Sequence, residues 1–261
     1  MKPLVVIPAR FASTRYPGKP LVGLTGATGE VKSLIERSWD AAKSVAGIDA
    51  CVVATDDDRI RDHVLEFGGD VAMTSTSCRN GTERCAEVAA QRPEFDLIVN
   101  FQGDAPLTPP WFVTEILKDL EAHQNAAMAT PVLRLDPEHL ASFREDRRHD
   151  RVGGTTAIFA PDGRAIYFSK EVLPFTPTES DAPFYHHVGV YAYRRASLLA
   201  YADTPETELE KREGLEQLRF IVNGEEVRCS LVEAQGRSFW ELNNPEDVPR
   251  IERILKDDNI S

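Results

Sequence analysis

The sequence has few cysteines and no apolar run long enough to cross a membrane. The run near the N-terminus, Leu4–Ile7, is too short for the hydrophobic region of a signal peptide, and no small-residue cleavage site follows it. The cysteines lack C-x-x-C spacing and have no clustered histidines beside them; they are Cys51, Cys78, Cys85 and Cys229. These absences predict a protein of the reducing cytoplasm that does not insert into a membrane.

Positive charge is also scarce. The chain has 30 Lys and Arg residues against 42 Asp and Glu residues, which gives a formal net charge of −12. Nucleic acids and anionic membranes attract basic surfaces, so neither is expected as a partner. An anionic ligand would therefore need a local site where the few cations gather.

Short apolar, β-branched runs alternate with helical patterns along the first half of the chain. The runs are Leu4–Ile7, Cys51–Ala54, Leu97–Phe101 and Met128–Leu133. Between the first two runs, apolar and small residues from Leu34 to Val45 recur at helical spacing. The alternation predicts an α/β fold with a wound, mostly parallel sheet and helices on both faces.

The composition of the chain changes in its later part. A charged run at 144–151 and a proline-rich stretch at 174–183 suggest an excursion from the core over about residues 136–190. Since no repeat or linker divides the chain, we expect one domain over residues 1–261 that contains this excursion. Beyond it the sequence predicts a half-buried strand over His187–Tyr193 and helices near Glu208–Ile221 and Pro245–Leu255.

Ligands of wound α/β sheets bind beyond the carboxyl ends of the parallel strands. The segments that follow the first three predicted strands are Pro8–Pro20, Thr55–Asp58 and Gln102–Pro106. We therefore expect these loops to meet at one edge of the sheet and to form the functional site.

The loop after the first strand contains three cations, Arg10, Arg15 and Lys19, among small residues. Small residues let backbone N–H groups approach phosphate oxygens, arginine binds them bidentately, and lysine adds a compact charge. The P-loop pattern G-x-x-x-x-G-K-[ST] and the dinucleotide pattern G-x-G-x-x-G are both absent. The loop therefore predicts a polyphosphate site of another class of nucleotide-binding protein.

The same loop is similar to the P-A-R-x-x-S-T-R-x-P-G-K-P signature of the CMP-Kdo synthetases, the 3-deoxy-manno-octulosonate (Kdo) cytidylyltransferases. The similarity continues in family order over most of the chain, through Val53–Asp56, Met73–Thr74, Gly81–Arg84, Gln102–Asp104, Ile166–Lys170, His187–Tyr191 and Leu215–Arg219. It implies a nucleotide-diphospho-sugar-transferase-like fold with an appended dimerisation arm. It also implies a homodimer in which residues 136–190 form the contact surface.

The resemblance implies a site for CTP and Mg2+. Arg10, Arg15 and Lys19 would hold the triphosphate and, with Asp104, form the catalytic group. The implied nucleotide-binding residues are Pro8, Ala9, Arg10, Ser13, Thr14, Arg15, Lys19, Asn80, Gly81, Arg84 and Gln102. Asp104 would bind Mg2+, because a carboxylate beside a triphosphate is a suitable hard-oxygen ligand. Asn243 stands where the family places a second metal-binding aspartate.

The acceptor side of the site rests on the resemblance. His187, Tyr191, Glu216 and Gln217 match positions around the sugar acid and offer hydrogen-bond donors and acceptors for its carboxylate and hydroxyls. The implied reaction is transfer of CMP from CTP to the anomeric 2-hydroxyl of Kdo, a 2-keto-3-deoxy sugar acid, with release of pyrophosphate. The product, CMP-Kdo, would supply lipopolysaccharide or capsule synthesis.

Some positions depart from the family pattern. Asn243 replaces an aspartate and Ala105 replaces a glutamate, while Thr25–Glu30 replaces a shorter turn. Gly153-Gly154-Thr155-Thr156 stands where an N-x-V-K segment is expected. Two alternatives therefore stay open: a cytidylyltransferase for another sugar acid, such as amino-Kdo or a nonulosonic acid, and a non-catalytic CTP-binding homologue.

Overall fold

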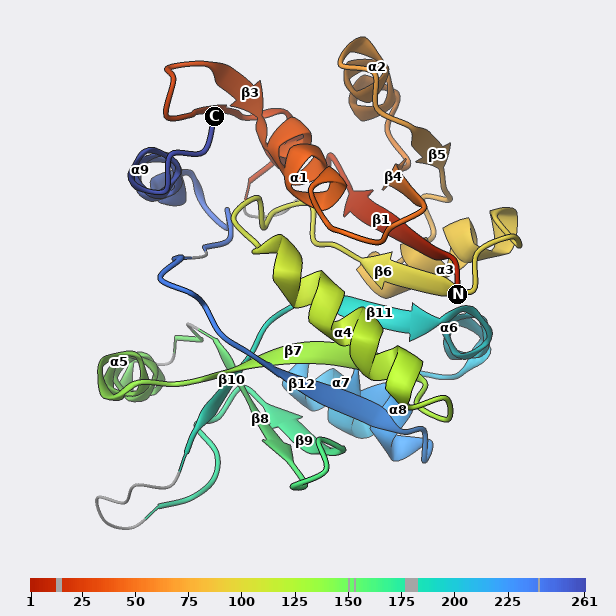
Figure 1. The fold of residues 1–261 in the computed structure, drawn as a ribbon, viewed down its shortest axis with the longest axis vertical. Helices are drawn as coiled ribbons and strands as arrows, with labels where there is room; N and C mark the ends of the chain where they lie inside the picture. The colour runs from red at the N-terminus through yellow and green to blue at the C-terminus, as the bar shows by residue number, and fades with distance from the viewer. Residues whose placement is uncertain (13–15, 150, 153, 177–182, 239) are drawn as a thin grey trace. The chain divides into compact units, whose positions relative to one another are not determined.

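The computed structural model describes residues 1–12, 16–149, 151–152, 154–176, 183–238 and 240–261. The chain forms two compact units (Figure 1). The first unit comprises Met1–Thr114 and Ala234–Ser261, and the second comprises Glu115–Glu233. Helix α4 (Pro110–Ala122) contains the point in the chain where the first unit passes into the second.

The first unit is built on a parallel sheet with the order β5-β4-β1-β6. Its strands are β1 (Pro3–Ala9), β4 (Ala50–Thr55), β5 (Val71–Met73) and β6 (Leu97–Asn100). The central strands are almost continuously apolar and buried, as expected for a sheet covered on both faces. The predicted runs therefore correspond to β1, β4 and β6, and their carboxyl ends lie at one edge.

Helices cover both faces of this sheet. They are α1 (Leu34–Lys43), α2 (Asp58–Glu66) and α3 (Gly81–Gln91). Figure 1 shows α1 in front of the sheet and α3 behind it. Each helix begins at a side chain that accepts a backbone N–H bond, namely Ser33, Asp57 and Asn80. These N-caps fix where each helix starts after the preceding loop.

The C-terminal segment packs on the first loops of the same unit. It contains the 3-10 turn Pro245–Asp247 and helix α9 (Val248–Asp257). Residues 26–30 connect β2 (Gly23–Thr25) to β3 (Val31–Ser33), and the N–H of Ala27 donates to the carbonyl of Ile260 at 2.8 Å. The apolar cluster that joins these parts is Leu24, Leu34, Leu107, Leu242, Ile251 and Leu255. Segments distant in sequence thereby meet near the loops that follow β1 and β6.

In the second unit β7 (Met128–Arg134) pairs in parallel with β12 (Val227–Val232) and antiparallel with β10 (Tyr185–His187) and β11 (Tyr191–Arg194). Beyond β10 lie β8 (Thr155–Phe159) and β9 (Ala165–Ser169), also antiparallel. The helices are α5 (Pro137–Arg148), α6 (Arg195–Asp203), α7 (Glu208–Glu213) and α8 (Leu218–Val222). The segment 136–190 thus supplies α5 and three strands, and β10 pairs directly with β7.

The strand predicted over His187–Tyr193 is interrupted. Strand β10 ends at His187 and β11 begins at Tyr191. The reason lies opposite, where Pro131 of β7 has no N–H to donate and only its carbonyl accepts, from the N–H of Val188 at 3.1 Å. The side chain of Thr130 partly replaces the missing ladder bond.

The helix predicted near Glu208–Ile221 is also interrupted. Gly214 ends α7 with φ 60°, a left-handed conformation that favours glycine, and α8 begins at Leu218. Glu216 and Gln217 therefore lie in a turn between two short helices.

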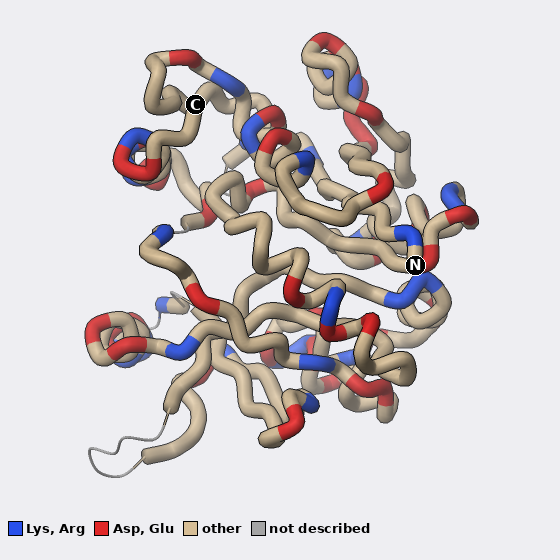
Figure 2. Tube along the Cα trace, viewed as in Figure 1, with Lys and Arg blue, Asp and Glu red and all other residues tan. Residues whose placement is uncertain are grey.

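Charge is distributed over both units. Figure 2 shows Asp and Glu on many elements, with Lys and Arg interspersed among them.

Among the described helices, none has the length and hydrophobicity required to span a bilayer. The free cysteines include Cys51 and Cys229, whose burial raises the pKa of each thiol to about 12.

Candidate functional site

The basic loop begins where β1 ends. Arg10 directly follows β1 and is exposed. The N–H of Gly18 donates to the carbonyl of Phe11 at 2.9 Å, which closes the loop, and the guanidinium of Arg59 lies 3.3 Å from the centre of the Phe11 ring. Three predicted residues, Ser13, Thr14 and Arg15, lie outside the described residues. Arg10 and Lys19 thus stand on either side of a loop held at its base.

Lys19 and Asp104 meet at the carboxyl edge of the sheet. The Nζ atom of Lys19 donates to Oδ2 of Asp104 at 2.7 Å, with the side chains 13% and 28% exposed. Gly103 permits this approach, because a Cβ at that position would lie 2.6 Å from the Pro8 carbonyl oxygen. The structure therefore brings together a cation from the loop after β1 and a carboxylate from the loop after β6, as the sequence predicts for these strand ends.

A backbone hydrogen bond of the preceding residue holds Asn243 close to this pair. The N–H of Leu242 donates to the backbone carbonyl of Asp104 at 2.8 Å, which holds the following residue beside the loop after β6. The side-chain amide of Asn243 donates to Glu241 at 3.4 Å, and its backbone N–H donates to Asp247 at 2.9 Å. The candidate metal residues are thus neighbours within the first unit.

The donor set here suits a hard cation such as Mg2+. The carboxylate of Asp104, which contacts the ammonium group of Lys19, and the side-chain amide of Asn243 can each supply an oxygen ligand. Within the described part of the chain, no group of three or more His, Cys, Asp and Glu side chains is arranged to hold a metal alone. The remaining metal ligands would have to come from phosphate oxygens and water, as is usual for Mg2+.

Arg84 is buried on α3 and bonded on two sides. Its Nη2 atom lies 3.2 Å from the Asp56 carboxylate, and its Nη1 atom donates to the hydroxyl of Thr74. Asp56 follows β4 and Thr74 follows β5, so Arg84 connects two strand ends at the same edge. Sequence reasoning singled out Arg84 and the loop Thr55–Asp58 but missed Asp56 as the partner of Arg84.

The other predicted nucleotide residues lie around the start of α3 and the ends of β1 and β6. Asn80 caps α3 by accepting the N–H of Glu83 at 2.8 Å, and Gly81 is the first residue of the helix. Pro8 and Ala9 are the last residues of β1. Gln102 follows β6, is partly exposed, and accepts the N–H of Ala105 at 3.1 Å through its backbone carbonyl. The described members of the predicted nucleotide set thus share the first unit and one edge of its sheet.

His187, in the second unit, is buried between two threonines. Thr130 donates its hydroxyl to the carbonyls of Val188 and Val190 at 3.1 and 2.9 Å, so it accepts from Nε2 of His187 at 3.0 Å. The Nδ1 atom then accepts from the hydroxyl of Thr155 at 3.0 Å. Burial lowers the pKa of His187 to about 3, which leaves the ring neutral. A sugar acid would have to exchange one of these threonine partners to reach a ring nitrogen.

Tyr191 belongs to a chain of aromatic rings that begins at His187. The ring centroids of His187 and Tyr191 are 5.5 Å apart, and Tyr193 stacks on Tyr191 at 5.9 Å. Phe220 of α8 stacks on Tyr193 at 5.7 Å. The ring chain therefore connects two predicted sugar-acid residues to the helix that begins directly after Gln217.

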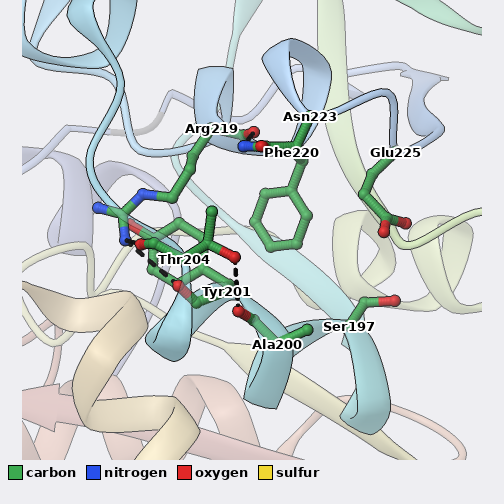
Figure 3. A pocket seen from close by; sticks show the side chains of 8 residues that line it. All are labelled: Ser197, Ala200, Tyr201, Thr204, Arg219, Phe220, Asn223 and Glu225. Carbon is green, nitrogen blue, oxygen red and sulfur yellow. Dashed lines mark hydrogen bonds between the residues drawn. The ribbon is translucent and has the colours of Figure 1, made fainter.

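Gln217 is 1% exposed, and neither polar atom of its side chain has a hydrogen-bond partner among the described residues. An unpaired buried amide is costly, so these atoms suit a ligand group. Glu216 lies beside it in the turn before α8. The guanidinium of Arg219, two residues after Gln217, pairs with Glu210 at 2.5 Å. It also donates to the carbonyls of Tyr201 and Thr204 (Figure 3).

Glu213 connects two of the segments that carry the sequence resemblance. Its carboxylate accepts from the hydroxyls of Tyr167 and Ser169 at 3.2 and 2.7 Å and from the N–H of Lys170 at 2.8 Å. Glu213 ends α7, just before the turn that contains Gln217. Sequence reasoning missed this carboxylate, although both segments that it joins were recognised.

Comparison with known proteins identifies the family. Residues 4–227 match the cytidylyltransferase family. The chain belongs to this family. Similar relatives of this cytidylyltransferase include the 3-deoxy-manno-octulosonate cytidylyltransferase of Maricaulis maris, 44% identical over 98% of this chain and 97% of that protein. The protein of the same name from Chlamydia trachomatis serovar L2 is 39% identical over 97% of this chain and 94% of that protein.

A solved structure agrees with these relatives. The chain is similar to CMP:2-keto-3-deoxy-manno-octonic acid synthetase complexed with CTP, with a TM-score of 0.87 and 30% identity. The similarity covers 99% of this chain and 100% of that protein. The predicted family and the α/β fold class are therefore confirmed for this cytidylyltransferase.

Thr156 shows what one departure from the family pattern does. The resemblance implies a lysine here, but Thr156 is 1% exposed, donates to the carbonyl of Glu171 at 2.6 Å and accepts the N–H of Leu173 at 3.2 Å. Its hydroxyl thus stabilises the segment after β9 and carries no charge. This position of the cytidylyltransferase supplies no cation for an acidic acceptor.

Proposed function

We propose that this cytidylyltransferase transfers CMP from CTP to the anomeric 2-hydroxyl of Kdo, giving CMP-Kdo and pyrophosphate. The observation that carries the proposal is the 2.7 Å contact between Lys19 and Asp104 at the carboxyl edge of a parallel sheet. It places a phosphate-binding cation beside a hard-oxygen metal ligand, the combination that nucleotidyl transfer requires. The relatives named for this activity match the chain along nearly its full length.

The transfer needs no covalent enzyme intermediate. The anomeric oxygen of the sugar acid forms a bond to the α-phosphorus of CTP, the bond from that phosphorus to the bridging oxygen breaks, and pyrophosphate leaves. The hydroxyl proton passes to solvent. Arg10, Arg15 and Lys19 would hold the triphosphate in line and stabilise its charge, and the loss of one such contact should cost about 10²-fold in rate, roughly 3 kcal/mol.

Asp104 and Asn243 would hold Mg2+ in this proposal. The ion, when bound, would neutralise the charge of the triphosphate. Lys19 pairs with Asp104, and it would turn to the phosphates when Mg2+ takes its place on the carboxylate. An amide at position 243 in place of a carboxylate lowers the negative charge of the site, so we expect weaker binding of the free ion than in relatives with aspartate.

The sugar acid would bind at His187, Tyr191, Glu216 and Gln217. The strongest support is the buried amide of Gln217, whose donor and acceptor atoms lack partners among the described side chains and could pair with a carboxylate and a hydroxyl. The neutral ring of His187 supports hydrogen bonding to hydroxyls more than ion pairing. These residues share the second unit.

A second candidate acceptor is another 2-keto-3-deoxy sugar acid, such as amino-Kdo. The buried, uncharged Thr156 favours it, because the cation implied by the family is missing there. An acceptor that carries its own ammonium group would depend less on such a cation. The chemistry at phosphorus would be the same.

We further propose a cytoplasmic homodimer whose product enters lipopolysaccharide or capsule synthesis. Free thiols at all four cysteines support a reducing compartment. Within the segment 136–190, Ile166 and Phe175 expose 52% and 85% of their surface, which supports a contact between copies there. The oligomeric state is measurable by sedimentation.

Pyrophosphate release with CTP, Mg2+ and Kdo tests the proposal. We expect release that requires the acceptor and falls by about 10²-fold or more in Asp104→Ala. Asp62→Ala is the matched control, since this exposed carboxylate on α2 pairs with the adjacent Arg61. Equal rates in the two variants would contradict the role of Asp104, and release only with amino-Kdo or a nonulosonic acid would transfer the assignment to that acceptor.

A further inference from the structure

Asn100 is the last residue of β6, and its side-chain amide is buried. The residue is 1% exposed, and among the described residues neither Nδ2 nor Oδ1 has a hydrogen-bond partner. It pairs in register with Val6, so its side chain lies on the same face of the sheet as those of Val6 and Pro8. This face of the sheet packs against α3.

An amide left without partners in a protein interior costs about 1–3 kcal/mol. Ile98 and Val6, whose side chains lie on the same face of the sheet, are fully buried and apolar, so an apolar residue at position 100 would suit the sheet better. Buried groups that stay unsatisfied in a native structure call for a specific explanation, and a missing ligand is one.

The amide lies beside Gly81, the first residue of α3. A Cβ built on Gly81 would lie 3.5 Å from Nδ2 of Asn100 and 3.4 Å from Cγ of Pro8, which are ordinary contact distances. Gly81 also has no positive φ. Among the described residues nothing therefore requires glycine there, although alanine forms helices better by about 1 kcal/mol.

An absent side chain and an unpaired amide at one point indicate that a ligand group approaches there. The amide has a donor and an acceptor side by side. A phosphate would bond only to the donor and would repel Oδ1, and the predicted phosphate cations lie on a different loop. The edge of a pyrimidine base offers a donor and an acceptor next to each other, which matches both atoms of the amide.

We propose that Asn100 binds the edge of the pyrimidine base of CTP, and that Gly81 leaves the room through which the base reaches it. The inference rests on the proposed function and adds a specificity-determining residue to it. The base would supply hydrogen-bond partners for Asn100. It would also lie against the first turn of α3, an 11-residue helix whose N-terminal N–H groups favour an acceptor.

The substitution Asn100→Leu tests the proposal because it keeps the volume and removes both polar atoms. We expect the melting temperature of the ligand-free protein to stay equal or rise, since the unpaired amide is gone. The Kd for CTP, measured by calorimetry, should rise about tenfold, the equivalent of about 1.4 kcal/mol. A purely structural asparagine would give the opposite pattern, a lower melting temperature and an unchanged Kd.

Gly81→Ala gives a second, independent readout. The added methyl group fits the free protein and improves the helix, so the melting temperature should not fall. The same methyl group would occupy the space of the base and raise the Kd for CTP at least tenfold. Binding of pyrophosphate, which has no base, should be unchanged in both variants.

Gln217→Leu is the matched control, because it removes a buried amide of the second unit that likewise has no partner among the described residues. It should weaken binding of the sugar acid and leave the Kd for CTP unchanged. If Asn100→Leu and Gly81→Ala bind CTP as tightly as the wild type, the inference is wrong while the proposed function stands. If the wild type itself does not bind CTP, the proposed function fails first.

Discussion

At the scale of single residues, His187 is held neutral by Thr130 and Thr155 in the second unit. Burial, with a smaller contribution from His186, lowers its pKa from 6.5 to about 3. In the unfolded chain the ring has its ordinary pKa, so between these two values the unfolded state binds one more proton than the folded state. The stabilisation is complete above about pH 6.5 and is lost as the pH falls toward 3.

We therefore expect His187→Gln to flatten the pH dependence of stability. One such group contributes a slope of about 1.4 kcal/mol per pH unit in this window. Urea unfolding between pH 6.5 and 4.5 measures it, with His149→Gln as the control, since that exposed ring lies beside Glu145 on the surface. Equal slopes in wild type and His187→Gln would contradict the assignment of a neutral buried ring.

The residues of the candidate site differ in how far the sequence predicts them. Lys19 and Asp104 were predicted because each follows a buried strand, and parallel strands bring such loops to one edge. Asn100 carried no signal, because it lies inside the predicted run Leu97–Phe101, where one polar residue does not change the prediction of a strand. Whether its amide finds hydrogen-bond partners depends on how α3 and β1 pack around it, which the local sequence does not contain.

At the scale of elements, α7 and α8 depend on one buried ion pair. Arg219 and Glu210 are 2% and 3% exposed at the side chain, and Arg219 also lies 3.9 Å from the centre of the Tyr201 ring. Glu210 closes the capping box of α7 with Thr207 as well. The pair thus fixes the turn that contains Glu216 and Gln217.

Glu210→Ala should lower the free energy of unfolding by about 3–5 kcal/mol, because it leaves a buried guanidinium unpaired and removes a cap. Glu208→Ala on the same helix is the matched control, since its pair with Lys211 is exposed, and it should change stability by less than about 1 kcal/mol. Urea denaturation of both variants measures the difference. Similar losses in the two would show that the buried pair has no special role.

Element boundaries were the part of the fold that local pattern predicted least well. Alternation over His187–Tyr193 predicted one strand, yet Pro131 on the facing strand interrupts the ladder. That interruption depends on which residue lies opposite, and the pattern of one segment does not contain this information. The parallel strands of the first unit were predicted because their apolar runs need no partner to be recognised.

At the scale of the whole molecule, the chain divides its predicted functions between two compact units. The described nucleotide and metal residues belong to the first unit, and the predicted sugar-acid residues belong to the second. The first unit includes the C-terminal segment with Asn243, which the topology returns to the loop after β6. Variants in each unit should accordingly affect one substrate, as the pair Asn100→Leu and Gln217→Leu tests.

CMP transfer to Kdo is tested most directly by identifying the product by mass spectrometry after incubation with CTP, Mg2+ and Kdo. We expect a CMP-Kdo phosphodiester and pyrophosphate in equal amounts, with neither formed when Kdo is omitted. Pyrophosphate without the phosphodiester, or neither compound despite measurable CTP binding, would contradict CMP transfer to Kdo.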